Sequence, residues 1–299
     1  MALTKERYEE LMQIIGADVH TYPEFAEEIR NFSDLVDRKT LEMEAAGYPF
    51  KVYVNTPHNM GKKAPMFINI HGGGWWKGYL DNDVYFAAWL ANAIGGVVFD
   101  IDYTTSVTAP WPVMLEQCQA AVEYALAHTE ALGCDLARVS IGGYSAGGHI
   151  TASLMNAYSR KGKSPFALDI LCYSPLNLYV KTVDENAPEA EQRRRFRGNA
   201  MEELARGGDD ALLEDIDFNV QLTPDELLAN YPATLIITAG KCGFRFEDEA
   251  FGVRLAAQGV ETTIKRFPGA AHGFIPHFTS YWQDGAELMV KHIVAAKRP

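Results

Sequence analysis

A serine flanked by glycines, Gly143-Tyr144-Ser145-Ala146-Gly147, stands between two segments of different pattern. The short apolar run at 138–141 predicts a strand, and residues 150–158 predict a helix. A strand that passes into a helix so abruptly must turn sharply, which strains the serine backbone and requires glycine at its close neighbours. This pattern is typical of a nucleophile elbow, although short glycine-serine patterns also occur by chance. Its meaning therefore depends on whether the chain also supplies a base, an acid and donors for an oxyanion.

Strands and helices alternate along most of the chain. This alternation predicts an α/β fold with a mostly parallel central sheet and helices on both faces. The predicted strands cover residues 50–54, 65–70, 96–101, 139–141, 168–173, 235–239 and 262–267. The predicted helices between and after them cover residues 113–129, 150–158, 247–258 and 281–296.

Two regions depart from this alternation. Residues 4–47 carry apolar side chains at helical spacing, with a break at Pro23, and predict helices without a strand. Residues 181–230 are polar and poorly periodic, and predict loops and short helices between two sheet strands. We therefore expect one domain over residues 1–299, with 1–47 as a helical cap and 181–230 contributing to the cap or the rim of the site.

Composition limits the partners and the compartment. The formal net charge of −12 argues against nucleic acid or an anionic membrane surface as a partner. The single basic run, Arg193–Arg197, lies among acidic residues and predicts a solvated helix face. The segment Met1–Glu10 lacks the apolar core of a signal peptide, no run reaches the roughly 20 apolar residues of a membrane helix, and the four cysteines lie far apart without metal-like spacing. We expect a cytoplasmic protein without metal or cofactor, and the sequence leaves open whether it forms a homo-oligomer.

A glycine-rich segment, His71-Gly72-Gly73-Gly74-Trp75-Trp76, follows the strand predicted to end at residue 70. Consecutive glycines at the carboxyl end of a strand allow backbone N–H groups to turn into a cleft. There they can bind the negative oxygen that develops when a carbonyl carbon is attacked. We expect the N–H groups of Gly73, Gly74 and Ala146, the residue after the serine, to form this oxyanion hole.

A serine hydroxyl needs an adjacent base to become a good nucleophile. His272 lies in the loop at 268–274, after the last predicted strand and before the last helix, from which it can reach the elbow. His277 is the second candidate for this base. His71 and His149 are close to the site in sequence, but we expect them to order the glycine loop and to begin the elbow helix.

Three motifs in order, His71-Gly72-Gly73-Gly74, Gly143–Gly148 and His272-Gly273-Phe274, resemble those of the hormone-sensitive-lipase-like esterases of the α/β-hydrolase superfamily. The resemblance runs from about residue 50 to the C-terminus, and the N-terminal helices are similar to the cap of that family. It implies the α/β-hydrolase fold. It also implies hydrolysis of carboxylic esters through an acyl-enzyme intermediate, with no cofactor.

The chain departs from this family at the acid. Members usually have an aspartate in an Ala-Gly-x-Asp-x-Leu-x-x-Glu context, and ungapped counting places Cys242 at that position. A cysteine is normally neutral and cannot stabilise an imidazolium as a carboxylate does. The catalytic acid is then Glu247 as first choice or Asp248 as second, or the enzyme works as a Ser145–His272 dyad.

Two further departures lie near the oxyanion glycines. Of the family's Tyr-Arg-Leu-Ala-Pro-Glu stretch, only Tyr103 is clearly retained in the segment 103–110, so the support beneath the glycine loop is altered. Trp75 and Trp76 add two large rings beside the glycines. We expect at least one of them to line the substrate pocket, the alternative being that they pack beneath the cap.

The sequence thus predicts a serine hydrolase of small to medium carboxylic esters. Ser145 attacks the ester carbonyl, and His272 takes the proton and returns it to the leaving alcohol. An acetylated sugar or an aryl ester would suit such a site. Two alternatives remain open: transfer of the acyl group to an acceptor other than water, and a binding protein that has lost turnover with the acid.

Overall fold

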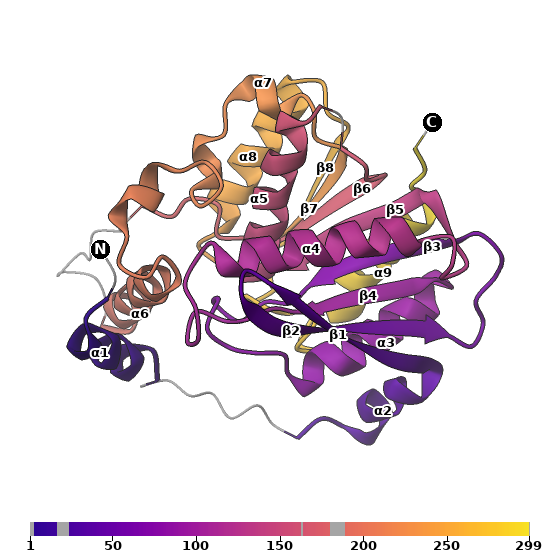
Figure 1. Cartoon of the computed structure of the whole chain (residues 1–299), viewed down its shortest axis with the longest axis horizontal. Coiled ribbons are helices and arrows are strands. Elements are labelled where there is room, and N and C mark those ends of the chain that lie inside the picture. The colour runs from indigo at the N-terminus through magenta and orange to yellow at the C-terminus, as the bar shows by residue number, and fades with distance from the viewer. Residues whose placement is uncertain (1–2, 17–23, 163, 180–188, 299) are drawn as a thin grey trace.

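The computed structural model describes residues 3–16, 24–162, 164–179 and 189–298 (Figure 1). These residues contain one 8-stranded sheet in the order β1-β2-β4-β3-β5-β6-β7-β8. β2 pairs antiparallel with both β1 and β4, and all other neighbours pair in parallel. The mostly parallel sheet predicted from the sequence is therefore confirmed. The strands are β1 Val36–Ala45, β2 Tyr48–Pro57, β3 Ala64–Ile70, β4 Val97–Asp102, β5 Cys134–Tyr144, β6 Leu168–Cys172, β7 Ala233–Ala239 and β8 Thr262–Phe267.

Helices cover both faces of this sheet, as the alternating pattern predicts. Helices α4, α5 and α8 pack on one face, and α3 and α9 pack on the other (Figure 1). The α-helices are α1 Lys5–Gly16, α2 Glu27–Arg30, α3 Asp81–Ile94, α4 Val113–His128, α5 Ala146–Arg160, α6 Glu189–Ala205, α7 Asp225–Leu228, α8 Arg245–Ala257 and α9 Trp282–Ala295. The 3-10 helices are η1 Asn31–Leu35, η2 Asp210–Glu214 and η3 Val220–Leu222.

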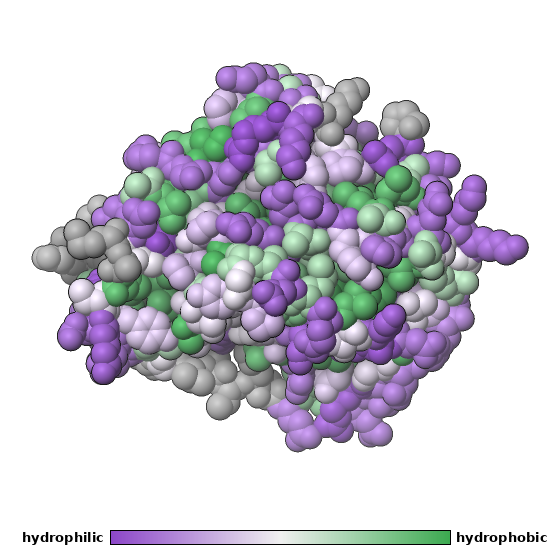
Figure 2. Space-filling model, viewed as in Figure 1, coloured by the Kyte–Doolittle hydropathy of each residue, from purple (hydrophilic) through white to green (hydrophobic). Residues whose placement is uncertain are grey.

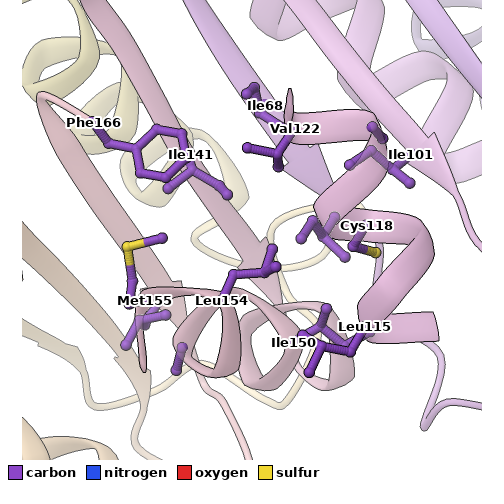
Figure 3. Close-up of a cluster of buried hydrophobic side chains, with 14 of the residues drawn as sticks. Ile68, Ile101, Leu115, Cys118, Val122, Ile141, Ile150, Leu154, Met155 and Phe166 are labelled. Carbon is purple, nitrogen blue, oxygen red and sulfur yellow. The ribbon is translucent and has the colours of Figure 1, made fainter. Parts of the chain in front are cut away.

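The central strands are buried on both faces, which explains their continuous apolar sequences. Every residue of β3 is buried, and side chains from β3 and β5 meet those of α4 and α5 in one core. Figure 3 shows Ile68 and Ile141 of these strands facing Val122 of α4 and Leu154 of α5. This core fixes the carboxyl end of β5, where the elbow serine stands.

The prediction that residues 4–47 are helical throughout is wrong at its C-terminal end. Residues 36–45 form β1, an edge strand paired with β2. The connecting residues Ala46 and Gly47 have φ angles of 53° and 77°, which is the geometry of a tight two-residue hairpin. Side chains in the stretch Leu41–Ala45 alternate between partly buried and exposed, a strand pattern that the helical interpretation overlooked. The predicted break at Pro23 lies outside the described residues.

Two helices were not expected in their observed form. Helix α3 falls in a region for which no element was predicted. Helix α6 has 17 residues, although only loops and short helices were predicted for 181–230, of which residues 181–188 lie outside the described part. The polar sequence of α6 does not predict a helix packed on the protein, because only a few of its side chains are apolar and pack inward.

Helices α1 and α6 lie side by side at one end of the molecule (Figure 1). Leu11 and Ile15 of α1 pack against Ala200 and Leu204 of α6, with Trp76 at the edge of this cluster. Hydrophilic residues cover much of the face seen in Figure 2, with smaller hydrophobic patches between them. Among the described residues, no helix has the length and apolar character needed to cross a membrane.

Candidate active site

Ser145 stands in a tight turn between β5 and α5. Its backbone has φ 53° and ψ −120°, a conformation that non-glycine residues rarely adopt. A Cβ atom on Gly143 would lie 2.4 Å from the carbonyl carbon of Gly147, and one on Gly147 would lie 2.0 Å from the oxygen of Ile70. The backbone N–H of Ser145 donates to the oxygen of Cys172 at 2.9 Å. The two glycines flanking the serine are therefore required by close backbone contacts on both sides.

His272 meets the serine as the sequence predicts. The two side chains come from loops 127 residues apart, and Nε2 of His272 lies 2.9 Å from Oγ of Ser145. The rings of Tyr173 and Phe244 pack edge-on against the imidazole at centroid distances of 5.1 and 5.5 Å. Desolvation of the ring, with a contribution from the nearby His277, lowers the pKa of His272 to about 4. At neutral pH the imidazole is thus uncharged and able to accept a proton.

The other nitrogen of His272 faces a thiol. Sγ of Cys242 lies 3.3 Å from Nδ1, and Cys242 is buried in the turn after β7. Burial raises the pKa of this thiol to about 11, so it is neutral at physiological pH. Ungapped counting in the sequence had placed Cys242 at this position of the site.

A neutral thiol constrains the histidine less than a carboxylate would. A carboxylate only accepts hydrogen bonds, which forces the proton onto Nδ1 and leaves Nε2 free to accept from the serine. A thiol can accept weakly from Nδ1 when that nitrogen carries the proton, or donate weakly to it when it does not. Cys242 therefore permits the productive tautomer of His272 but does not enforce it.

Glu247 and Asp248, the predicted acids, are directed elsewhere in this geometry. Oε1 of Glu247 accepts hydrogen bonds from the backbone N–H groups of Leu176 and Asn177, at 2.9 and 3.4 Å. Oδ1 of Asp248 accepts from the N–H of Ser174 at 3.1 Å, and burial raises the pKa of this carboxyl well above its usual value. The expectation that Glu247 occupies the third position is thus corrected, because both carboxylates hold the backbone that follows β6 and Cys242 meets Nδ1.

The glycine loop lies beside the serine. A Cβ atom on Gly72 would be 2.8 Å from the oxygen of Tyr144 and 3.4 Å from Cβ of Ser145. Gly73 and Gly74 follow with φ angles of 121° and 59°, in the region that favours glycine. The loop closes through N–H groups of Trp76 and Lys77 that donate to the oxygen of Gly73. The loop and the N-terminus of α5, which begins at Ala146, thus lie on either side of Ser145.

His71 orders this loop from beneath, as predicted. Its Nδ1 donates to the oxygen of Gly72 at 2.6 Å, and its ring stacks on Tyr103 at a centroid distance of 4.4 Å. Burial lowers the pKa of His71, which keeps the ring neutral. The hydroxyl of Tyr103 donates to the oxygen of His71 at 3.3 Å, so the retained tyrosine still supports the loop. Further along the altered stretch, Ser106 donates both its N–H and its hydroxyl to the oxygen of Trp75.

His149 ties the same loop to the elbow helix. Nε1–H of Trp75 donates to Nδ1 of His149 at 3.1 Å, and Nε2 of His149 donates to the oxygen of Phe218 at 2.6 Å. Because an indole nitrogen only donates, the proton of the neutral imidazole must be on Nε2. Burial lowers the pKa of His149 to about 4. The sequence placed His149 at the start of the helix but did not predict its contact with Trp75.

A cavity of about 770 Å³ opens above Ser145 and His272. Trp75 and Trp76 both border it, as expected, although Trp75 is 3 % exposed and uses its indole nitrogen within the protein. His277, the second candidate base, also borders the cavity, and burial together with Lys77 lowers its pKa to about 4. Helix α6 forms one wall, so the basic run predicted as a solvated face contributes three arginines to the cavity.

The fold and these motifs agree with comparisons to known proteins. A family model described as an alpha/beta hydrolase fold matches residues 67–276, which include the glycine loop, the elbow and His272. The chain therefore belongs to the α/β-hydrolase family.

Several similar proteins are described as esterases. Carboxylesterase NlhH of Mycobacterium tuberculosis is 26% identical over 276 residues, covering 89% of this chain and 84% of that protein. Esterase LipI of the same species is 27% identical over 220 residues, covering 71% of this chain and 66% of that protein. Among solved structures, carboxyl esterase 2 of the fungus Tuber melanosporum and a bacterial heroin esterase each have a TM-score of 0.78 and 25% identity. The first covers 99% of this chain and 100% of that one, and the second covers 99% and 91%.

Proposed function

We propose that this protein hydrolyses carboxylic esters of small molecules through an acyl-enzyme intermediate, with Ser145 as nucleophile. The observation that carries the proposal is the 2.9 Å contact between the Ser145 hydroxyl and Nε2 of His272 at a strained elbow. His272, neutral at pH 7, accepts the serine proton and returns it to the leaving alcohol. The esterase names of the similar proteins support the same class of reaction.

The oxyanion is assigned to three backbone N–H groups. Those of Gly73 and Gly74 lie in the loop beside the serine, and that of Ala146 is at the first position of α5, where a helix has no internal acceptor for it. Such donors stabilise the tetrahedral intermediate because they are fixed before the reaction begins. The contacts of His71 and Trp75 keep the loop in place.

Cys242 is assigned a positioning role. Its thiol holds Nδ1 of His272 without supplying the charge that a carboxylate gives to the imidazolium. We therefore place the enzyme closer to a Ser–His dyad than to a full triad. Glu247 stabilises the backbone around Leu176 and takes no part in proton transfer.

Helices α1 and α6 are assigned to the cap, together with the other residues of the segment 189–230 between β6 and β7. Helix α6 lines the cavity above the serine, α1 packs on α6, and Trp76 lies where these two helices meet the oxyanion loop. A cavity of about 770 Å³ suits a small to medium ester. The acceptor of the acyl group is water.

The test is a rate comparison on 4-nitrophenyl acetate and butyrate. Ser145→Ala and His272→Asn should each lower kcat/KM by about 1,000-fold or more, because serine and base act as one unit. Ser159→Ala is the matched control. Its hydroxyl lies on α5, the helix that follows Ser145, is buried, and has no hydrogen-bond partner among the described residues. Equal rates for wild type and Ser145→Ala would contradict the proposal and favour a binding protein, whereas faster ester consumption with an added alcohol, giving a new ester, would favour acyl transfer.

A further inference from the structure

The residues that line the cavity have a charge balance opposite to that of the whole chain. The whole sequence has 27 lysine and arginine residues against 39 aspartate and glutamate residues. Among the described residues that line the cavity, cationic side chains outnumber carboxylates. The cationic ones are Lys77, Arg194, Arg195, Arg197, Lys241 and Arg245, and the carboxylates are Asp83, Glu191, Glu202 and Glu247.

The cationic side chains come from three segments that surround the Ser145–His272 pair. Lys77 ends the oxyanion loop, the arginines of 194–197 belong to α6, and the third segment is the turn between β7 and α8. Where that turn ends and α8 begins, Nη1 of Arg245 donates to the oxygens of Gly240 and Cys242 at 2.8 and 3.2 Å. These contacts fix one guanidinium next to the residue that holds His272.

The carboxylates of the lining offset these charges only in part. Glu191 pairs with Arg195 at 3.3 Å, and Oε1 of Glu247 accepts the two backbone hydrogen bonds described above. Asp83 accepts from the N–H of Leu80 at 2.9 Å, and burial raises the pKa of its carboxyl well above the usual value, so it carries little charge at neutral pH. With Glu191, Glu202 and Glu247 counted as charged, the lysine and arginine side chains of the lining still outnumber its carboxylates, so its formal charge is positive.

Two of the cations repel each other across the site. Burial and the neighbouring Arg197 lower the pKa of Lys77, and Lys77 in turn lowers the pKa of His277. Arg194 acts in the same sense on Cys242, whose thiolate its charge would favour. A negative group bound between these side chains would remove this repulsion.

An apolar wall adjoins the cationic one. A Cβ atom on Gly74 would lie 2.7 Å from Sδ of Met201 and 3.3 Å from the ring of Trp76, so both side chains close over the oxyanion loop. Phe244 and Phe246 also line the cavity. A ligand that fits both walls has an apolar portion and one negative group.

We propose that the preferred substrates are small esters that keep a free carboxylate, bound by Lys77 and the α6 arginines while Ser145 attacks the ester carbonyl. The inference rests on the proposed esterase function and specifies its substrate class. Guanidinium groups suit a carboxylate because they can bind both of its oxygens at once. The carboxylate can belong to the acyl group or to the alcohol, and the two cases need separate probes.

Two matched pairs of esters test the inference. Mono(4-nitrophenyl) adipate carries a free carboxylate on its acyl group, and its methyl ester is the neutral counterpart. Acetylsalicylate carries the carboxylate on its alcohol portion, and its methyl ester is again the neutral counterpart. The wild type should show a kcat/KM about tenfold or more higher for the anionic member of at least one pair, measured above the Ser145→Ala baseline. This preference should shrink as salt rises from about 0.02 M to about 0.5 M, because exposed charges are screened.

Substitutions of single cavity residues test which side chains cause the preference for the anionic ester. Arg194→Gln and Lys77→Gln should each lower the ratio of kcat/KM for the anionic ester to kcat/KM for the neutral ester by about tenfold, mainly through a higher KM for the anionic ester. Arg193→Gln is the matched control, since Arg193 is on the same helix, 68% exposed and paired with Glu189 outside the cavity lining. Its KM values should equal those of the wild type.

The outcomes separate the two proposals. Equal or lower kcat/KM for the anionic member of both pairs, with neutral esters still cleaved in a Ser145-dependent way, would overturn the substrate inference alone. A preference that survives both cavity substitutions would also overturn it. Hydrolysis of neutral and anionic esters that does not depend on Ser145 would overturn the proposed function itself.

Discussion

The two ends of the site are constrained to different degrees. At the serine end, the turn between β5 and α5 is packed backbone against backbone, and a single added methyl group at Gly147 would approach the oxygen of Ile70 to 2.0 Å. At the other end, the turn after β7 presents one side chain, Cys242, to Nδ1 of His272 at 3.3 Å. The first arrangement depends on main-chain geometry, while the second depends on the chemistry of one residue.

This difference explains how the chain can depart from the family pattern at the acid while it retains the serine elbow. A change of residue at the elbow would move strand and helix, whereas a change at position 242 leaves the fold intact and alters only the charge beside the imidazole. The serine end is therefore the part of the site that cannot vary. The residue that faces Nδ1 of His272 can be exchanged. Its exchange should change the catalytic rate and its pH dependence more than the stability of the fold.

We expect the largest loss of stability and activity from Gly147→Ala, which should disrupt the turn around Ser145. The methyl group would collide with the carbonyl groups of Ile70 and His71, so we expect a loss of about 3 kcal/mol or more in the free energy of unfolding and at least about 1,000-fold in kcat/KM. Urea unfolding and an ester assay measure the two effects. Gly61→Ala is the control, since nothing lies within 4 Å of its added Cβ atom. A stable, active Gly147→Ala protein would refute the packing argument.

Cys242→Asp tests the other end by restoring charge. A carboxylate at Nδ1 fixes the productive tautomer and stabilises the imidazolium, so kcat should rise by about 10- to 100-fold. The same charge should raise the pKa of His272 from about 4 toward its ordinary value of 6.5.

Because the base is active only when neutral, the wild-type rate should fall only as pH drops toward about 4, and the fall in Cys242→Asp should begin at higher pH. A pH profile of kcat/KM measures this shift. Cys242→Asn, similar in size but uncharged, should show neither the gain nor the shift. An unchanged profile in Cys242→Asp would mean that this side chain does not act through Nδ1.

Glu247→Gln separates a structural carboxylate from a catalytic one. Loss of its charge weakens the hydrogen bonds to Leu176 and Asn177, and we expect a loss of about 1 kcal/mol in the free energy of unfolding. The activity and the pH profile should stay near those of the wild type. Glu287→Gln, on an exposed position of α9, controls for the loss of charge. A large fall in kcat without a fall in stability would return Glu247 to the role of acid.

Cys242→Ala should have the smallest effect. A neutral thiol contributes one weak hydrogen bond, so its removal should change kcat by less than about fivefold. Burst kinetics with 4-nitrophenyl acetate separates acylation from deacylation in this variant. A fall of more than about 100-fold would show that the thiol does much of the work of a carboxylate.

The catalytic pair was predictable because its signals are local. The glycines around Ser145, the glycine loop after β3 and the loop of His272 each follow a strand, so sequence order alone brings them to one edge of the sheet. Strand β1 was missed because the helical pattern of the preceding residues was extended across 36–45, although Leu41, Met43 and Ala45 alternate with charged residues as in a strand. The cationic wall was missed because it is assembled from three separate segments. The direction of Glu247 depends on side-chain geometry that no sequence pattern encodes.

The link from Trp75 through His149 to the oxygen of Phe218 has a consequence for acid tolerance. His149 must stay unprotonated to accept from the indole, and its pKa is lowered from 6.5 to about 4 in the folded protein. An unfolded chain takes up this proton near 6.5, so folding stability is complete above that pH and declines as pH falls from about 6.5 to about 4. The lower pH limit of the enzyme is thus set in part by a histidine that is buried beneath the oxyanion loop.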